Sequence, residues 1–132
     1  MSEGNVQEPG SEALVDRRTV LKAGALAGVA AFLAACRIPG FSAAVAFYGG
    51  MVGKFADEKP KCPLQMHFGE KDDGIPMDVV DTIKKKQPQA ETYVYPGAPH
   101  GFHADYRPSY RKEAAEDGWN QAIAWFKKYK VL

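Results

Sequence analysis

Apolar residues along the chain gather in short blocks separated by Pro and Gly, and three of these blocks have the length of strands. Residues 43–48 form a continuous apolar run that is closed by Gly49 and Gly50. Residues 63–68 and 92–95 are further runs, the last one rich in β-branched and aromatic side chains. Short apolar runs bounded by turn residues are typical of strands buried in a parallel sheet.

Two longer segments have the periodicity of amphipathic helices. Pro76 begins the first, and three lysines at 84–86 close it, which suits the negative end of the helix dipole. Ser109 is the candidate N-cap of the second, whose apolar stripe would lie against the sheet. That stripe consists of Ala115, Trp119, Ala122, Ile123, Phe126 and Tyr129. Strands that alternate with helices predict an α/β fold with about three parallel strands, flanking helices and an incomplete sheet, and residues 51–62 are predicted to be a loop.

The first 36 residues have a different composition and indicate a leader. Residues 1–16 are polar and acidic without an apolar period, which predicts disorder. Arg17 and Arg18 precede an uncharged stretch that ends at Cys36, and together they resemble a twin-arginine export signal. The signal predicts a periplasmic or exported protein if it works, and a cytoplasmic protein otherwise.

Residues 33–36 also resemble a lipoprotein processing box, in which Cys36 would carry a lipid anchor. The predicted organisation is a leader with a signal-like apolar segment over residues 1–36, followed by a folded domain over residues 37–132.

A buried helix is the alternative explanation of the same apolar segment. Residues 24–28 have the glycine spacing of a nucleophile turn, and residues 29–35 would then be the helix behind it. Leu26 would hold the place of the nucleophile, and leucine has no lone pair with which to attack. The paired arginines are explained only by export, so they favour the signal.

Composition narrows the classes of function without naming one. The chain has 132 residues, of which 45% are hydrophobic and 25% charged, as in one ordinary globular domain. Seventeen basic and sixteen acidic side chains give a net charge of +1, so nothing favours a nucleic-acid partner. Three histidines and two cysteines without metal-type spacing predict neither a zinc site nor a cofactor.

The candidate chemistry lies in two loops, each of which follows an apolar run. Asp72 lies in the loop 69–76 and His100 in the loop 97–103, so both would emerge at the carboxyl ends of neighbouring strands. In α/β-hydrolases a Ser or Cys nucleophile, an Asp and a His follow one another in this chain order. The acid and the base of such a triad are therefore present, without a nucleophile ahead of them.

Residues 43–130 resemble the carboxyl-terminal part of the dienelactone hydrolase family, which has the α/β-hydrolase fold. The matching pieces are Ala-Val-Ala-Phe-Tyr-Gly-Gly at 44–50, Gly-Glu-Lys-Asp-Asp-Gly-Ile-Pro at 69–76, Tyr-Pro-Gly-Ala-Pro-His-Gly-Phe at 95–102, Arg-Pro-Ser-Tyr at 107–110 and Trp-Phe-Lys-Lys-Tyr at 125–129. The resemblance implies a partial α/β-hydrolase fold and hydrolysis of a small ester or lactone through a Cys/Ser-His-Asp triad. The family's acid stands four residues before the proline of its loop, which selects Asp72, and the base is the His of His-Gly-Phe, which selects His100.

The chain departs from the family's pattern where the nucleophile should be. The family has a cysteine in a G-x-C-x-G turn about two dozen residues before the Tyr-Gly pair, whereas here Leu26 stands 22 residues before Tyr48. Cys36 and Cys62 lie too far along the chain to replace it. Some members also hold a substrate carboxylate with an arginine four residues after the His, and Ala104 occupies that place.

Three functional hypotheses remain. The chain is a truncated or recombined hydrolase, a catalytically silent exported α/β fragment that serves as a binding or assembly module, or one part of a split enzyme. An incomplete sheet exposes a strand edge, which predicts self-association. Of the remaining candidates, His67 is predicted to be a packed core residue, His103 a surface or loop-stabilising residue, and Asp73 a turn former beside Gly74.

Overall fold

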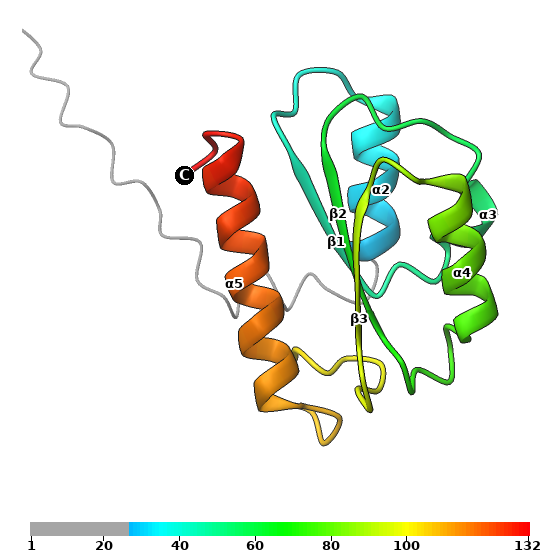
Figure 1. Ribbon diagram of the computed structural model, residues 1–132, viewed down its shortest axis with the longest axis vertical. Helices are drawn as coiled ribbons and strands as arrows, with labels where there is room; N and C mark the ends of the chain where they lie inside the picture. The colour runs from blue at the N-terminus through cyan, green and yellow to red at the C-terminus, as the bar shows by residue number, and fades with distance from the viewer. Residues whose placement is uncertain (1–26) are drawn as a thin grey trace, which may run out of the picture.

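Three parallel strands form the centre of the molecule, and helices cover both faces of the sheet (Figure 1). The computed structural model describes residues 27–132. Its elements are α2 (Ala27–Arg37), β1 (Ala44–Phe47), α3 (Val52–Phe55), β2 (Leu64–Gly69), α4 (Met77–Lys86), β3 (Glu91–Tyr95) and α5 (Lys112–Lys128). The predicted α/β fold with three parallel strands, flanking helices and an open sheet is confirmed.

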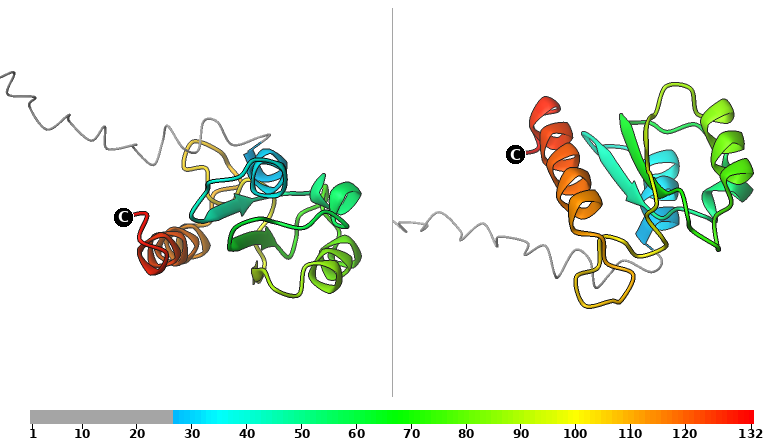
Figure 2. Two further views of the ribbon diagram at one scale, coloured as in Figure 1. Left: turned by 90° about the horizontal axis from the view of Figure 1, so that it is seen from above. Right: turned by 60° about the horizontal axis from the view of Figure 1, so that its bottom comes forward.

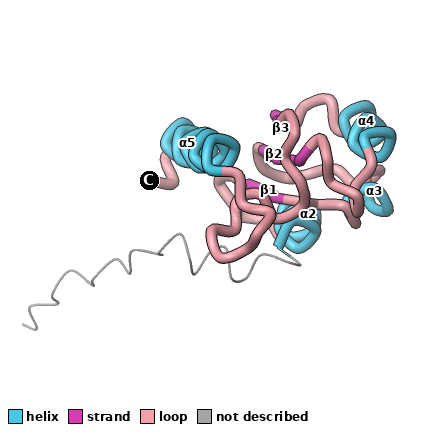
Figure 3. The backbone as a smooth tube through the Cα atoms, turned by 90° about the horizontal axis from the view of Figure 1, so that it is seen from below, coloured by secondary structure: helices cyan, strands magenta, loops and turns pink. Residues whose placement is uncertain are grey.

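The strands pair in the order β1-β2-β3, so β2 is central. Ala44 pairs with Leu64 at one end of the sheet, and Gly69 pairs with Tyr95 at the other. All three strands therefore end at the same edge. Figure 3 views the molecule from this end, where the loops that follow the strands gather.

One face of the sheet is apolar, because alternate residues of a strand point to opposite sides. Leu64, Met66 and Phe68 of β2 are buried and belong to one cluster with Phe32 of α2 and Ile83 of α4. The helices α2, α3 and α4 lie on this side, and α5 lies on the other side (Figure 2).

The opposite face is polar and aromatic. Gln65 and His67 point from β2 toward α5, with Phe47, Tyr93 and Tyr95 from the neighbouring strands around them. All six residues of β2 are buried, so the polar side chains Gln65 and His67, which alternate with its apolar ones, are covered by α5 as well.

The segment expected to end the leader at residue 36 differs in the structure. Residues 27–36 belong to α2, which packs against β1 and places Phe32 and Ala35 at 0% and 1% exposure. This packing is what the alternative of a buried helix requires, and the export signal stays a prediction. Arg17, Arg18 and Leu26 lie outside the described residues.

Cys36 also lies inside α2, and 6% of its surface is exposed. If the Cys36 sulfur carried a lipid chain, the end of α2 would have to move out of the apolar cluster in which Cys36 is buried. None of the helices in residues 27–132 is both long and apolar enough to cross a membrane.

Three local expectations are wrong. The expected loop over 51–62 contains the short helix α3. Ser109 is not the N-cap of α5, because that helix has Arg111 at the cap and the Ser109 hydroxyl instead donates to the carbonyl of Gly101. The buried stripe of α5 is also rotated from the expected one, and it consists of Ala115, Gly118, Ala122 and Trp125.

Candidate active site

Asp72 is buried in the loop that connects β2 to α4. It is 3% exposed, and its Oδ1 accepts hydrogen bonds from the backbone N–H groups of Gly74 (2.9 Å) and Ile75 (3.1 Å). These two bonds fix the carboxylate and leave Oδ2 for a further partner. The turn-forming carboxylate is thus Asp72, whereas Asp73, predicted for that role, is exposed.

His100 lies on the loop that follows β3, which packs directly on the loop of Asp72. The backbone N–H of Lys71 donates to the carbonyl of Ala98 at 3.0 Å. Gly69 allows this approach, because a Cβ there would stand 2.2 Å from the same carbonyl oxygen. Two glycines with positive φ, Gly97 (68°) and Gly101 (75°), shape the loop on either side of His100.

The two loops bring together the acid and the base chosen from the sequence. His100 Nδ1 lies 2.7 Å from Asp72 Oδ2. Because a carboxylate can only accept, Nδ1 carries the proton of the neutral imidazole and Nε2 keeps its lone pair. The His100 side chain is 41% exposed while that of Asp72 is fully buried. An imidazole that is oriented by a carboxylate at Nδ1 and is partly exposed to solvent can act as a general base through Nε2.

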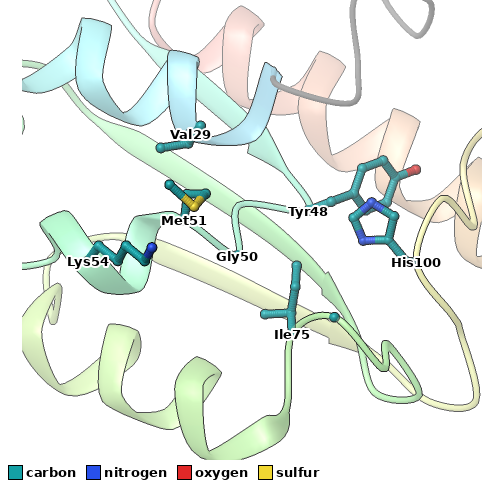
Figure 4. A pocket seen from close by; sticks show the side chains of 8 residues that line it. Val29, Tyr48, Gly50, Met51, Lys54, Ile75 and His100 are labelled. Carbon is teal, nitrogen blue, oxygen red and sulfur yellow. The ribbon is translucent and has the colours of Figure 1, made fainter.

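A cavity of about 340 Å³ opens in front of His100 (Figure 4). Tyr48 and Ile75 form its wall beside the imidazole, and Lys54 lies farther along the cavity. Val29 also lines it, so the first turn of α2 reaches the same space as His100. The cavity can hold a small molecule next to the Asp72–His100 pair.

His67 is the centre of a second cluster, which has no access to this cavity. It is 0% exposed, as predicted for a core residue, and its Nδ1 and Nε2 pair with the Tyr95 hydroxyl (3.0 Å) and with Gln65 Oε1 (2.8 Å). The ring stacks on Phe47, with 4.3 Å between the ring centroids. Burial, with a smaller contribution from His103, lowers the pKa of His67 to about 3. His67 therefore stays neutral over the physiological range.

Of the two alternatives predicted for His103, the surface position is wrong, because this side chain is fully buried. Its ring lies 4.9 Å from the ring of Phe47 and 6.2 Å from that of Trp119 on α5. Its backbone N–H donates to the Tyr48 hydroxyl at 2.8 Å. His103 thus joins the loop of His100 to the layer beneath α5.

Sequence reasoning missed the cavity residues Tyr48, Lys54 and Val29. The Tyr-Gly pair after the first apolar run was a signal for Tyr48, but nothing in the pattern of the chain placed it beside His100. Within residues 27–132 no group of three or more His, Cys, Asp or Glu side chains is placed to hold a metal ion.

Comparison with known proteins connects this arrangement to one family. The model of the dienelactone hydrolase family matches residues 25–130. A protein of Escherichia coli (strain K12) assigned as a carboxymethylenebutenolidase is 38% identical over 112 residues, which are 74% of this chain and 41% of that protein. A protein of Methylorubrum extorquens with the same assignment is 40% identical over 114 residues, 76% of this chain and 39% of the relative.

A solved structure gives the same result. The crystal structure of a Klebsiella pneumoniae protein assigned as a dienelactone hydrolase superimposes with a TM-score of 0.69 at 38% identity, covering 75% of this chain and 47% of that one. A Bradyrhizobium protein assigned as a 2-oxo-3-(5-oxofuran-2-ylidene)propanoate lactonase is 31% identical over 110 residues, 72% of this chain and 44% of that protein. The chain spans less than half the length of these relatives.

Proposed function

Since the chain belongs to the dienelactone hydrolase family, we propose that Asp72 and His100 are the acid and the base of a site that hydrolyses small esters or lactones. The observation that carries the proposal is the 2.7 Å hydrogen bond between Asp72 Oδ2 and His100 Nδ1 at the wall of an open cavity. His100 Nε2 would take the proton of an attacking group, and Asp72 would stabilise the imidazolium that forms.

The Asp72–His100 pair also needs a nucleophile to activate, and we propose that its position in the chain is residue 26. Val29, three positions later, lines the cavity with His100. A Cβ on Gly28 would stand 2.1 Å from the carbonyl oxygen of Phe47, so the start of α2 lies tightly against the end of β1. Both observations support a nucleophile turn just ahead of α2, as in α/β-hydrolases. Leu26 has no nucleophilic atom, so the chain itself would hydrolyse esters weakly.

The relatives and the cavity indicate the class of substrate. One relative is assigned as a lactonase that acts on a propanoate, which is an acid. Lys54 lines the cavity at some distance from His100, in a region where a carboxylate of a bound substrate would meet its ammonium group. A small ester or lactone that also carries a carboxylate therefore suits the site.

Restoring the missing thiol tests the proposal. We expect Leu26→Cys to raise the turnover of a small activated ester well above that of the unchanged chain. Met51→Cys is the matched control, because Met51 lines the same cavity and is 46% exposed, yet lies on another segment. Equal turnover by both variants, or no gain at Leu26→Cys, contradicts a nucleophile position at residue 26.

The alternative is a catalytically silent exported fragment, and the leucine at position 26 is the observation that favours it. Export itself is tested by replacing Arg17 and Arg18 with lysine, which should keep the protein in the cytoplasm. Unchanged location of that double variant defeats the export signal. A silent module would be exported normally and show no turnover in either Leu26→Cys or the unchanged chain.

Self-association through the sheet remains part of the proposal. Within residues 27–132, β1 pairs with β2 alone, so its second edge has no strand partner in this part of the chain. Such an edge favours pairing with another chain. Sedimentation of the purified protein should show a species larger than the monomer, whereas a single monomer boundary at all concentrations contradicts it.

A further inference from the structure

Tyr48 has an unusual backbone conformation beside the candidate site. It follows β1 directly and has a φ of 57°, in the left-handed region. Bulky side chains rarely adopt this conformation because of the close contact that it imposes on Cβ. Gly49 and Gly50, which tolerate it, come immediately afterwards, yet the conformation falls on the tyrosine. The backbone N–H of Tyr48 donates to the carbonyl of His67 at 3.0 Å, and contacts of the Tyr48 side chain add to what holds this conformation.

Three of those contacts go to the loop that carries His100. The Tyr48 ring lies 5.1 Å from the imidazole of His100 and 5.3 Å from the ring of Phe102, which it meets edge-on. Its hydroxyl accepts a hydrogen bond from the backbone N–H of His103 at 2.8 Å. One side chain from the end of β1 thus touches three of the four residues 100–103.

The loop needs such support, because Gly97 and Gly101 flank His100 with positive φ angles and restrict the backbone little. Asp72 holds only one atom of the imidazole, Nδ1. The Tyr48 ring lies against the imidazole from the side of the cavity wall, as Figure 4 shows. Between them the two contacts define the plane of the ring and the direction of Nε2.

We propose that Tyr48 is a positioning residue that keeps the His100 imidazole aligned with Asp72. This inference rests on the proposed function of the Asp72–His100 pair and adds the residue that aligns it. The left-handed backbone at Tyr48 brings its ring into contact with the His100 imidazole and its hydroxyl into hydrogen-bond distance of the His103 N–H.

The tautomer of His100 reports on this alignment without any need for turnover. In ¹⁵N-labelled protein above the pH at which the imidazole is charged, the unchanged chain should show His100 protonated at Nδ1. Asp72→Asn should remove this preference and is the reference for a lost pair. Tyr48→Gly, which removes the side chain and relieves the backbone, should shift His100 toward a mixture of both tautomers.

Two further variants complete the experiment. Tyr48→Phe removes only the hydroxyl and should cause a smaller shift in the same direction, and it decides the question if Tyr48→Gly does not fold. Tyr106→Gly is the matched control, because Tyr106 lies in the same loop region but is 58% exposed, and it should leave His100 unchanged.

The outcomes separate the two proposals. An unchanged His100 tautomer in folded Tyr48→Gly, or in Tyr48→Phe where the glycine variant is unfolded, overturns the role of Tyr48 while the pair stands. An unchanged tautomer in Asp72→Asn instead overturns the pair itself.

Discussion

Two histidines of this chain, His100 and His67, each bind a side chain through Nδ1, but their surroundings give them different chemistry. His100 pairs with the carboxylate of Asp72 and opens onto a cavity, with 41% of its side chain exposed. His67 pairs with the hydroxyl of Tyr95 and the amide of Gln65 and is fully buried under α5.

The difference shows what makes an imidazole useful as a base. A carboxylate partner stabilises the imidazolium that forms when the ring takes a proton. Burial does the opposite, and together with a smaller contribution from His103 it lowers the pKa of His67 to about 3. His67 therefore holds the sheet and α5 together, and His100 is the ring that can move a proton.

The largest expected effect is on ester turnover, which should depend on His100 and not on His67. In the Leu26→Cys variant, His100→Ala should lower ester turnover by about 10²–10⁴, the usual contribution of a general base. His67→Phe in the same background should keep most of the turnover, because it preserves the stacking on Phe47. Steady-state assays of the three proteins measure this. A greater loss in His67→Phe than in His100→Ala, with both proteins folded, contradicts the comparison.

The free energy of unfolding should depend more on His67 than on His100. His67→Ala leaves a cavity and deprives the Tyr95 hydroxyl and Gln65 of a buried partner, which should cost about 2–4 kcal/mol of the free energy of unfolding. His100→Ala should cost less, because water can reach Asp72 Oδ2 through the open cavity. Urea unfolding of both variants at pH 7 compares them, and equal losses argue against a structural role for His67.

Acid should destabilise the protein through His67. Its pKa is about 3 in the folded chain against 6.5 ordinarily, so the unfolded chain binds the proton first as pH falls. This stabilisation is complete above pH 6.5 and is lost toward pH 3, by about 1.4 kcal/mol for each pH unit. Urea unfolding at several pH values should give this slope, and His67→Phe should flatten it. A slope that His67→Phe leaves unchanged assigns the acid sensitivity to other groups.

Much of the fold and both members of the pair followed from the sequence, because local signals determine them. The strands are short apolar runs closed by Gly or Pro, and Asp72 and His100 come just after two of them. Parallel strands that end at one edge bring such residues together without further information.

The remaining features depend on packing between distant segments, which the local pattern does not specify. The Ala-rich stretch before residue 37 suits both an export signal and a buried helix, and its composition does not specify the contact that α2 makes with β1. For His103 the sequence left open a surface position or a loop-stabilising one, and its burial beside Trp119 of α5 excludes the surface. The left-handed backbone of Tyr48 could not be predicted either, because the sequence would place such a conformation on Gly49 or Gly50, which follow it.

The central claim is that the Asp72–His100 pair can activate a group at position 26, and the reactivity of a thiol there tests it most directly. In Leu26→Cys, iodoacetamide should alkylate the thiol at a pH well below about 8.5, the pKa of an ordinary cysteine, because a neighbouring imidazolium stabilises the thiolate. Adding His100→Ala should return the alkylation profile to that of an ordinary thiol. A Leu26→Cys thiol that reacts with the same pH profile with and without His100 would contradict the account.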